Sequence, residues 1–546
     1  MLAKFFFNLF TGCDNGNNNK HVDTVSVSKC PFANSPSYRT NSAKRNSTDY
    51  HKRNSSSGAY TPSFTSYIFP NTNISLLNAK FKASSKASPP PSPARPTPYT
   101  YPRDSLNSLF KNVNNSWPPK SSPSTVPYPL SLYVQLCDQI PSRMTSDAYT
   151  HVEFMAWMIE YLSKNILHVM TDVMNKIEAL QPGDGHYEAM LSCLSVCLLS
   201  YRWGPLPNGS SVACVSSLQL PSELTIPFTR LTSRIGLPPC PTLYSTILCN
   251  WTESTTLNID NEEVVWPLDT RFTFSMRDDK DIGSTTERGF YLSVIRMESM
   301  AKKLYERAAT LVELVNGYAD IPSKPMSKTT KDNTGMKEQK IIEAMSQLRH
   351  SATQVFRVFY SMTAKSTQSS RGCPFASPFA MSASAWSTHA QTPTGWELSG
   401  FKGISGSQSL IIPVLDTVLS CVGTSPAYLD AVDSYKHYTT QTMRNFVDSI
   451  KNAPVSLREY VMKSKSVALR KEYNQLINSL AVFRMGHRAV GKKYLGGGEG
   501  NAEAEKTAGE LVDKIRKDGE STVDTFARAM TERILETKKL LVEEIR

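Results

Sequence analysis

Apolar residues at helical spacing fill most of the chain after residue 241. Six segments show the 3.6-residue period: Arg288–Tyr318, Gly335–Ala364, Ser405–Val422, Ser425–Ile450, Ser456–Leu495 and Ala502–Ile545. A helix with such a stripe buries one face against its neighbours. The pattern therefore predicts a large all-helical domain over residues 241–546.

The preceding residues, 128–240, predict a smaller unit. Helical periodicity recurs in Asp147–Leu180 and in Tyr187–Trp203, with a Pro-Gly pair between them. Pro and Gly interrupt residues 204–240, where Ser211–Leu218 and Leu224–Pro227 read as short extended pieces. We expect a small mixed α/β domain here, which makes the whole fold mainly α.

Residues 1–127 have a composition that opposes folding. Ser, Asn, Pro, Lys and Thr dominate, as in Ser88–Pro98 (SPPPSPARPTP). Such a segment cannot bury enough apolar area to offset the entropy lost on ordering, so we expect a disordered tail. Its Ser-rich, basic and acid-poor character also fits a transit peptide, which leaves import into an organelle open.

The net charge of +12 is concentrated in this tail. Residues 1–127 hold 15 Lys and Arg against four Asp and Glu, whereas the rest of the chain holds 45 against 44. The predicted folded part is therefore close to neutral. This distribution argues against a nucleic-acid partner.

The ten cysteines are scattered, without a C-x-x-C pair or a paired Cys/His metal spacing. That arrangement favours a reducing, cytoplasmic location over a disulfide framework. No stretch has the roughly 18 apolar residues of a membrane span, so we expect none. We also expect a monomer.

One helical segment places a histidine on its apolar face. The stripe runs in steps of four and three through Leu469, Tyr473, Leu476, Leu480, Phe483, His487, Val490 and Tyr494. Such a histidine is either a core residue satisfied by its neighbours or a cofactor ligand, and a neutral imidazole is a usual axial ligand of haem iron. Arg484, one turn earlier, needs an acidic partner or an anion such as a haem propionate.

Five segments, in order along residues 130–525, resemble the indoleamine 2,3-dioxygenases. The histidine lies in Phe483–Leu495 (FRMGHRAVGKKYL), a setting like that of the family's proximal haem histidine. The others are Ser200–Trp203 with Leu224–Trp251 (ending ILCNW), Phe272–Glu298 (FTFSMRDDKDIGSTTERGFYLSVIRME), Ser405–Asp416 (SGSQSLIIPVLD) and Met443–Tyr460.

The resemblance implies a haem b cofactor inside the large helical domain. It makes His487 the proximal iron ligand and pairs Arg484 with Asp416. It places Phe290 against the substrate ring in the distal pocket, and Ser405 and Gly406 at the haem edge near the substrate's amino group. The implied reaction belongs to tryptophan catabolism: both atoms of O2 insert across the indole C2–C3 bond of L-tryptophan, giving the N-formylkynurenine of the kynurenine pathway.

The sequence departs from the family's pattern in the distal pocket. Where the family has the arginine that binds the substrate carboxylate, this chain has Ala380. Arg371 is the nearest residue that could take the place of that arginine. The distal serine position becomes Val294, with Ser293 one residue earlier, and the pocket tyrosine becomes Leu243. For the family's mobile glycine-threonine loop the candidates are Gly496–Gly500 (GGGEG) and Lys506–Gly509. Loss of a charge-assisted contact to a carboxylate costs ~1.5–3 kcal/mol, which leaves affinity for tryptophan in doubt.

These departures keep a second function open: a catalytically degenerate haem-binding or haem-sensing protein of the same fold. Two identical Cys-Pro motifs, Cys30–Ala33 and Cys373–Ala376 (both CPFA), could ligate haem through a thiolate, or they occur by chance in Pro- and Ser-rich sequence. A haem-thiolate enzyme through Cys240, flanked by two prolines, is a weaker alternative. Phosphate binding at Gly496–Gly500 is weaker too, because a helix C-terminus explains those glycines.

Overall fold

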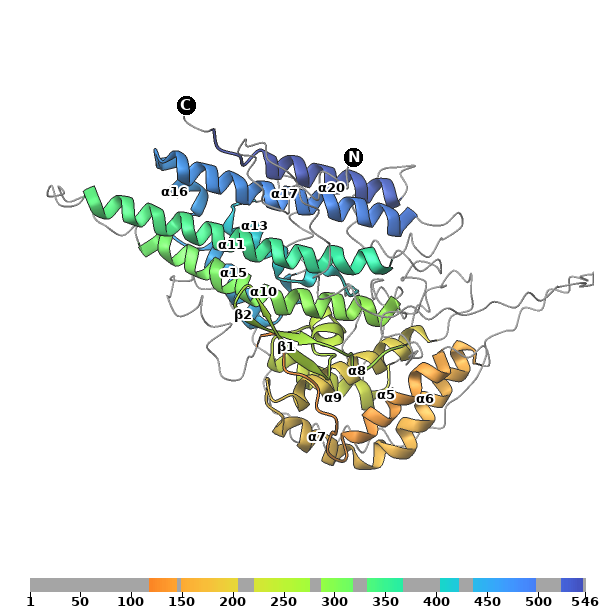
Figure 1. The fold of residues 1–546 in the computed structure, drawn as a ribbon. Helices are drawn as coiled ribbons and strands as arrows, with labels where there is room; N and C mark the ends of the chain where they lie inside the picture. The colour runs from red at the N-terminus through yellow and green to blue at the C-terminus, as the bar shows by residue number, and fades with distance from the viewer. Residues whose placement is uncertain are drawn as a thin grey trace, which may run out of the picture. The chain divides into compact units, whose positions relative to one another are not determined.

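The computed structural model describes residues 117–144, 149–204, 220–274, 286–317, 331–366, 403–421, 436–496 and 522–543. All of them belong to one compact unit, Pro93–Arg546. The fold is mainly α, as the sequence predicts (Figure 1).

Among the first described helices, α8 (His186–Trp203) is the central one, and its contacts include α5, α6 and α9. Most α8 side chains are buried, which explains why its sequence is apolar all round. The run predicted over Asp147–Leu180 divides into two helices joined by a 3-10 turn. The other elements of this part of the chain are α5 (Ser131–Met144), α6 (His151–Asn165), η1 (Leu167–Val169), α7 (Met170–Ala179) and α9 (Ser222–Arg234).

The prediction of an extended piece at Leu224–Pro227 is wrong, because these residues lie inside α9. Pro227 lacks the N–H that would bond to the carbonyl of Glu223 four residues earlier. The hydroxyl of Tyr133, on α5, donates to that carbonyl instead at 2.6 Å. A tertiary contact thus satisfies the group that the proline leaves open. The other predicted piece, Ser211–Leu218, lies outside the described residues.

Residues 241–546 are not entirely helical, since the structure contains a β-hairpin there. Strand β1 (Ser254–Ile259) pairs antiparallel with β2 (Glu262–Pro267), with Thr256 opposite Val265. The two turn residues, Asp260 and Asn261, both have positive φ, 53° and 64°, as a two-residue hairpin turn requires. The hairpin corrects the all-helical prediction for this region.

Four long helices form the main layer of the second half. They pack in the succession α10, α11, α17, α20 (Figure 1), and their bounds are α10 Thr286–Gly317, α11 Lys331–Ser366, α17 Val467–Gly496 and α20 Thr522–Lys538. Shorter elements complete this half: η2 (Tyr244–Leu248), η4 (Gly406–Gln408), α13 (Ile411–Val418), α15 (Gln441–Lys451) and α16 (Leu457–Lys463).

The core consists of two clusters of buried apolar side chains. The first core cluster draws mainly on residues 130–295 and the second mainly on residues 300–483. Tyr244 and Val294 pack against both, so η2 and the start of α10 lie where the two clusters meet. The domain boundary at residue 240 stays a prediction.

Residues 117–126, which the sequence places in the disordered tail, are packed in the structure. Trp117 is buried and its Nε1 donates to the carbonyl of Glu298 at 3.1 Å. Pro119 accepts from the indole of Trp251 at 3.1 Å. Two buried indoles thus fix a stretch whose composition alone predicts disorder. Residues 1–116 of the predicted tail lie outside the described residues. Within the ranges given above, none of the helices has both the length and the apolar character needed to cross a bilayer.

Candidate functional site

His487 lies on the inward face of α17, in line with buried Leu480 and Phe483. Aromatic rings surround it at centroid distances of 5.9 Å (Phe483), 5.6 Å (Phe359 on α11) and 5.8 Å (Phe526 on α20). Phe359 and Phe526 meet the imidazole edge to face. The apolar stripe of α17 therefore continues into an aromatic wall around the histidine.

The imidazole is in the neutral form that metal ligation requires. Burial, and next the positive charge of Arg484, lower the pKa of His487 to about 4. The side chain is still partly accessible. Among the described residues, none hydrogen-bonds to either of its ring nitrogens. A neutral ring with an uncommitted lone pair is a candidate axial ligand.

Glycines let the neighbouring helices approach α17 closely at this point. A Cβ on Gly486 would lie 2.0 Å from the hydroxyl of Tyr360 on α11, and one on Gly491 would lie 2.3 Å from the ring of Phe526. The Tyr360 hydroxyl donates to the carbonyl of Phe483 at 3.1 Å. The close packing of Tyr360 and of Phe526 against α17 thus depends on glycine at positions 486 and 491.

The structure brings Arg484 and Asp416 together, as the resemblance implies. The guanidinium is buried, and its Nη2 lies 2.5 Å and 2.7 Å from the two carboxylate oxygens. The same arginine donates to the hydroxyl of Thr537 on α20 and to the sulfur of Cys421 at 3.3 Å. The acidic partner that the sequence demanded is therefore present.

A second arginine completes this network, which the sequence reasoning missed. Arg533 on α20 lies 2.9 Å from Asp416 and 2.7 Å from Glu536. The positive charges of two guanidinium groups are thus matched by the negative charges of two carboxylates. The charges come from α13, α17 and α20, and no local spacing links these three elements.

The distal candidates lie on α10. Phe290 is partly buried and packs against the first core cluster, whereas the Phe483 ring beside His487 belongs to the second. The hydroxyl of Ser293 donates to the carbonyl of Phe290 at 2.7 Å, within the helix. Ser293 is therefore engaged with its own backbone.

The turn that carries Ser405 and Gly406 is anchored to η2. Gln408 accepts from the backbone N–H of Leu243 at 2.7 Å and donates to the carbonyl of Gly403 at 2.9 Å. Ser405 caps the turn by accepting from the N–H of Ser407 at 3.2 Å. The amide side chain of Gln408 thus connects residues 403–408 with the segment that departs from the family's pattern at Leu243.

Several predicted positions lie outside the described residues: Arg371, Ala380, Cys30–Ala33, Cys373–Ala376 and Lys506–Gly509. Of Gly496–Gly500, only Gly496 is described, and it ends α17. Cys240 is fully buried, and burial raises its pKa strongly, which opposes a thiolate ligand there. His168, His350 and His437 are exposed.

A model of the family described as indoleamine 2,3-dioxygenase matches residues 141–533. The chain is 23% identical to indoleamine 2,3-dioxygenase 1 of Rattus norvegicus over 286 residues, half of this chain and 62% of the relative. It is 24% identical to indoleamine 2,3-dioxygenase 2 of Homo sapiens over 320 residues, 57% of this chain and 69% of the relative. The match with the rat protein thus spans less than two thirds of its length. Because the family model covers well over half of the chain, the protein belongs to the indoleamine 2,3-dioxygenase family.

Proposed function

We propose that this chain is a haem-dependent dioxygenase that inserts both atoms of O2 across the indole C2–C3 bond of L-tryptophan, giving N-formylkynurenine. The observation that carries the proposal is His487: a neutral imidazole, without a hydrogen-bond partner among the described residues, on the inward face of α17. Family membership supports the reaction class.

The donor set fits haem b. His487 would bind the iron, and the haem would supply the redox chemistry with O2. The Arg484–Asp416 ion pair fixes α17 against α13, so it orients the imidazole. Phe359 and Phe526 pack edge to face against the ring.

The remaining site residues take roles toward the substrate. Phe290 would pack against the indole ring, and Ser405 and Gly406 would border the amino group. Ser293 would act mainly through the backbone of α10, because its hydroxyl already donates to Phe290. The protein's part is to orient the substrate; the reaction requires no general base from a side chain.

We extend the proposal to a cytoplasmic monomer. The cysteines of the described residues all carry free thiols, which suits a reducing compartment.

A degenerate haem-binding or haem-sensing protein is the second candidate. The observation that favours it is Ala380, where the family's pattern has the carboxylate-binding arginine. Both candidate functions require His487 as the iron ligand. Only the dioxygenase forms a product from tryptophan, so a product assay separates the two.

The test measures haem binding and product on the full chain. We expect a five-coordinate histidine–haem spectrum in the ferrous protein, which His487→Ala abolishes and the exposed-residue control His350→Ala preserves. We expect N-formylkynurenine from L-tryptophan, O2 and a reductant, and a lower kcat/KM for Phe290→Ala. Haem binding without product at millimolar tryptophan would reject the dioxygenase in favour of the second candidate; a wild-type chain that binds no haem would reject both.

A further inference from the structure

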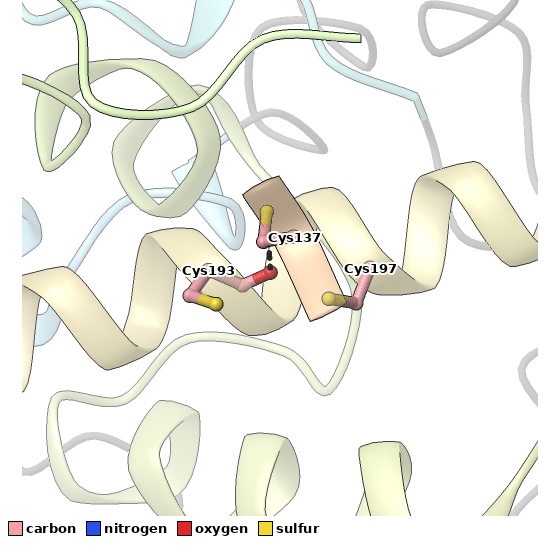
Figure 2. A group of neighbouring side chains, drawn as sticks. All are labelled: Cys137, Cys193 and Cys197. Carbon is pink, nitrogen blue, oxygen red and sulfur yellow. Dashed lines mark hydrogen bonds between the residues drawn. The ribbon is translucent and has the colours of Figure 1, made fainter. Parts of the chain in front are cut away.

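Three cysteines from two helices meet in the first core cluster. Cys137 comes from α5, and Cys193 and Cys197 lie one turn apart on α8; Figure 2 shows the last two sulfurs pointing toward each other with Cys137 above them. The three Sγ atoms lie within 4.8 Å of one another. The spacing of four residues on α8 was the only sequence signal, because Cys137 is 56 positions away from Cys193.

The cluster has the dimensions of a metal site. Three atoms at most 4.8 Å apart leave a point within about 2.8 Å of each of them, and a shift of about 0.5 Å per sulfur reaches the 2.3 Å of a metal–thiolate bond. Rotation of a cysteine side chain can supply such a shift. The backbone of α5 and α8 can stay in place.

The candidate ligand atoms are all sulfur, and all three cysteines are buried away from solvent. The relative exposures are 2% for Cys137 and 0% for Cys193 and Cys197. Within the described residues, no His, Asp, Glu or fourth Cys joins the group. Structural Zn²⁺ sites are almost always four-coordinate, whereas Cu⁺ is satisfied by two or three thiolates. The ligand count therefore favours Cu⁺.

We propose that Cys137, Cys193 and Cys197 form a buried all-sulfur binding site for a monovalent soft metal ion, Cu⁺. The site draws on α5 and α8, so binding would crosslink these two helices. It is independent of the proposed haem chemistry, because none of its ligands belongs to the His487 site. The alternative is three cysteines that serve as small apolar residues.

The experiment titrates Cu⁺ into reduced full-length protein under anaerobic conditions, against a chromophoric Cu⁺ chelator. Cys13, Cys30, Cys214 and Cys373, which lie outside the described residues, are replaced by Ser to remove competing thiols. We expect one Cu⁺ per chain, a sulfur-only shell by X-ray absorption at the copper edge, and a rise in the unfolding temperature with Cu⁺. Elemental analysis separates copper from haem iron.

Variants locate the site. Cys193→Ala should weaken Cu⁺ binding at least tenfold, whereas Cys240→Ala, another fully buried cysteine outside the cluster, should bind as the parent does. The temperature shift of the parent keeps the test valid if Cys193→Ala does not fold. Three results would overturn the proposal: no stoichiometric Cu⁺, tighter binding of Zn²⁺ than of Cu⁺, or equal losses in both variants. A disulfide between two cluster cysteines in reductively purified protein would also overturn it.

Discussion

The guanidinium of Arg484 on α17 holds both carboxylate oxygens of Asp416 on α13, at 2.5 Å and 2.7 Å. Arg533 on α20 approaches the same carboxylate at 2.9 Å. One acidic side chain thus joins three helices on the side of α17 that carries the candidate iron ligand. Because both arginines are buried, the loss of this carboxylate would leave two buried cations short of a partner.

Replacing that carboxylate should therefore destabilise the protein strongly. We expect Asp416→Asn to lower the free energy of unfolding by ~3–5 kcal/mol, the range for breaking a buried ion pair from one side, and to weaken haem retention. Denaturant unfolding measures the first effect and haem transfer to an acceptor protein the second. Glu160→Gln, in an exposed pair with Lys164, is the control and should change neither. A variant as stable as wild type would show that the network contributes nothing.

Gly486 should not tolerate even a methyl group. Its Cβ would lie 2.0 Å from the Tyr360 hydroxyl, so we expect Gly486→Ala to cost ~1–3 kcal/mol by overpacking. The effect should shrink in a Tyr360→Ala background, which removes both the hydroxyl and the ring carbons that lie 2.5 Å and 2.6 Å from the added Cβ. Gly335→Ala on α11 is the matched control, because nothing lies within 4 Å of its Cβ; there alanine should stabilise the helix by ~0.5–1 kcal/mol. The same sign for both variants would contradict the packing argument.

Glu298 on α10 should make stability depend on pH. It is fully buried and accepts from the hydroxyls of Ser409 and Tyr305, each at 2.5 Å. Burial raises the pKa of its carboxyl from 4.5 to about 7. A carboxyl whose pKa is higher in the folded than in the unfolded state stabilises the fold. This stabilisation is complete at pH values below the unfolded-state pKa, and it is lost as pH rises through the folded-state pKa.

Glu298→Gln keeps the acceptor oxygen and removes the titration. Its stability relative to wild type should therefore increase between about pH 5 and about pH 8, by up to about 3 kcal/mol. Urea unfolding of both proteins at the two pH values measures the change, and other titrating groups cancel in the difference. A constant difference across this range would rule out a titrating Glu298.

The hydroxyl of Tyr133 should stabilise the fold, because it replaces a hydrogen bond that Pro227 on another helix cannot make. It donates to the carbonyl of Glu223, which Pro227 cannot reach with an N–H. We expect Tyr133→Phe to cost ~0.5–1.5 kcal/mol, the net contribution of one hydrogen bond at a partly buried carbonyl. In a Pro227→Ala background the helix supplies its own donor, so the same change should cost less. Exposed Tyr128→Phe is the control, and a double-mutant cycle with zero coupling energy would refute the link.

Local periodicity determined where the helices lie and which face they bury. The steps of four and three from Leu469 to His487 sufficed to place the histidine on the inward face of its helix, in line with buried Leu480 and Phe483, and the structure has it there. The 3.6-residue period across residues 241–546 likewise determined a mainly α fold. These features follow from backbone geometry, because residues three and four apart always share a helix face.

Only the tertiary structure decided which distant side chains meet. Arg533 joins Asp416 from 117 positions away, and Cys137 joins two cysteines of α8 across 56 positions. A sequence period specifies a face without specifying its partner, so neither meeting could be read from spacing. The helix around Pro227 also depends on a tertiary contact. Local propensity argued against a helix there, and the hydroxyl of Tyr133 on another helix supplied the missing hydrogen bond.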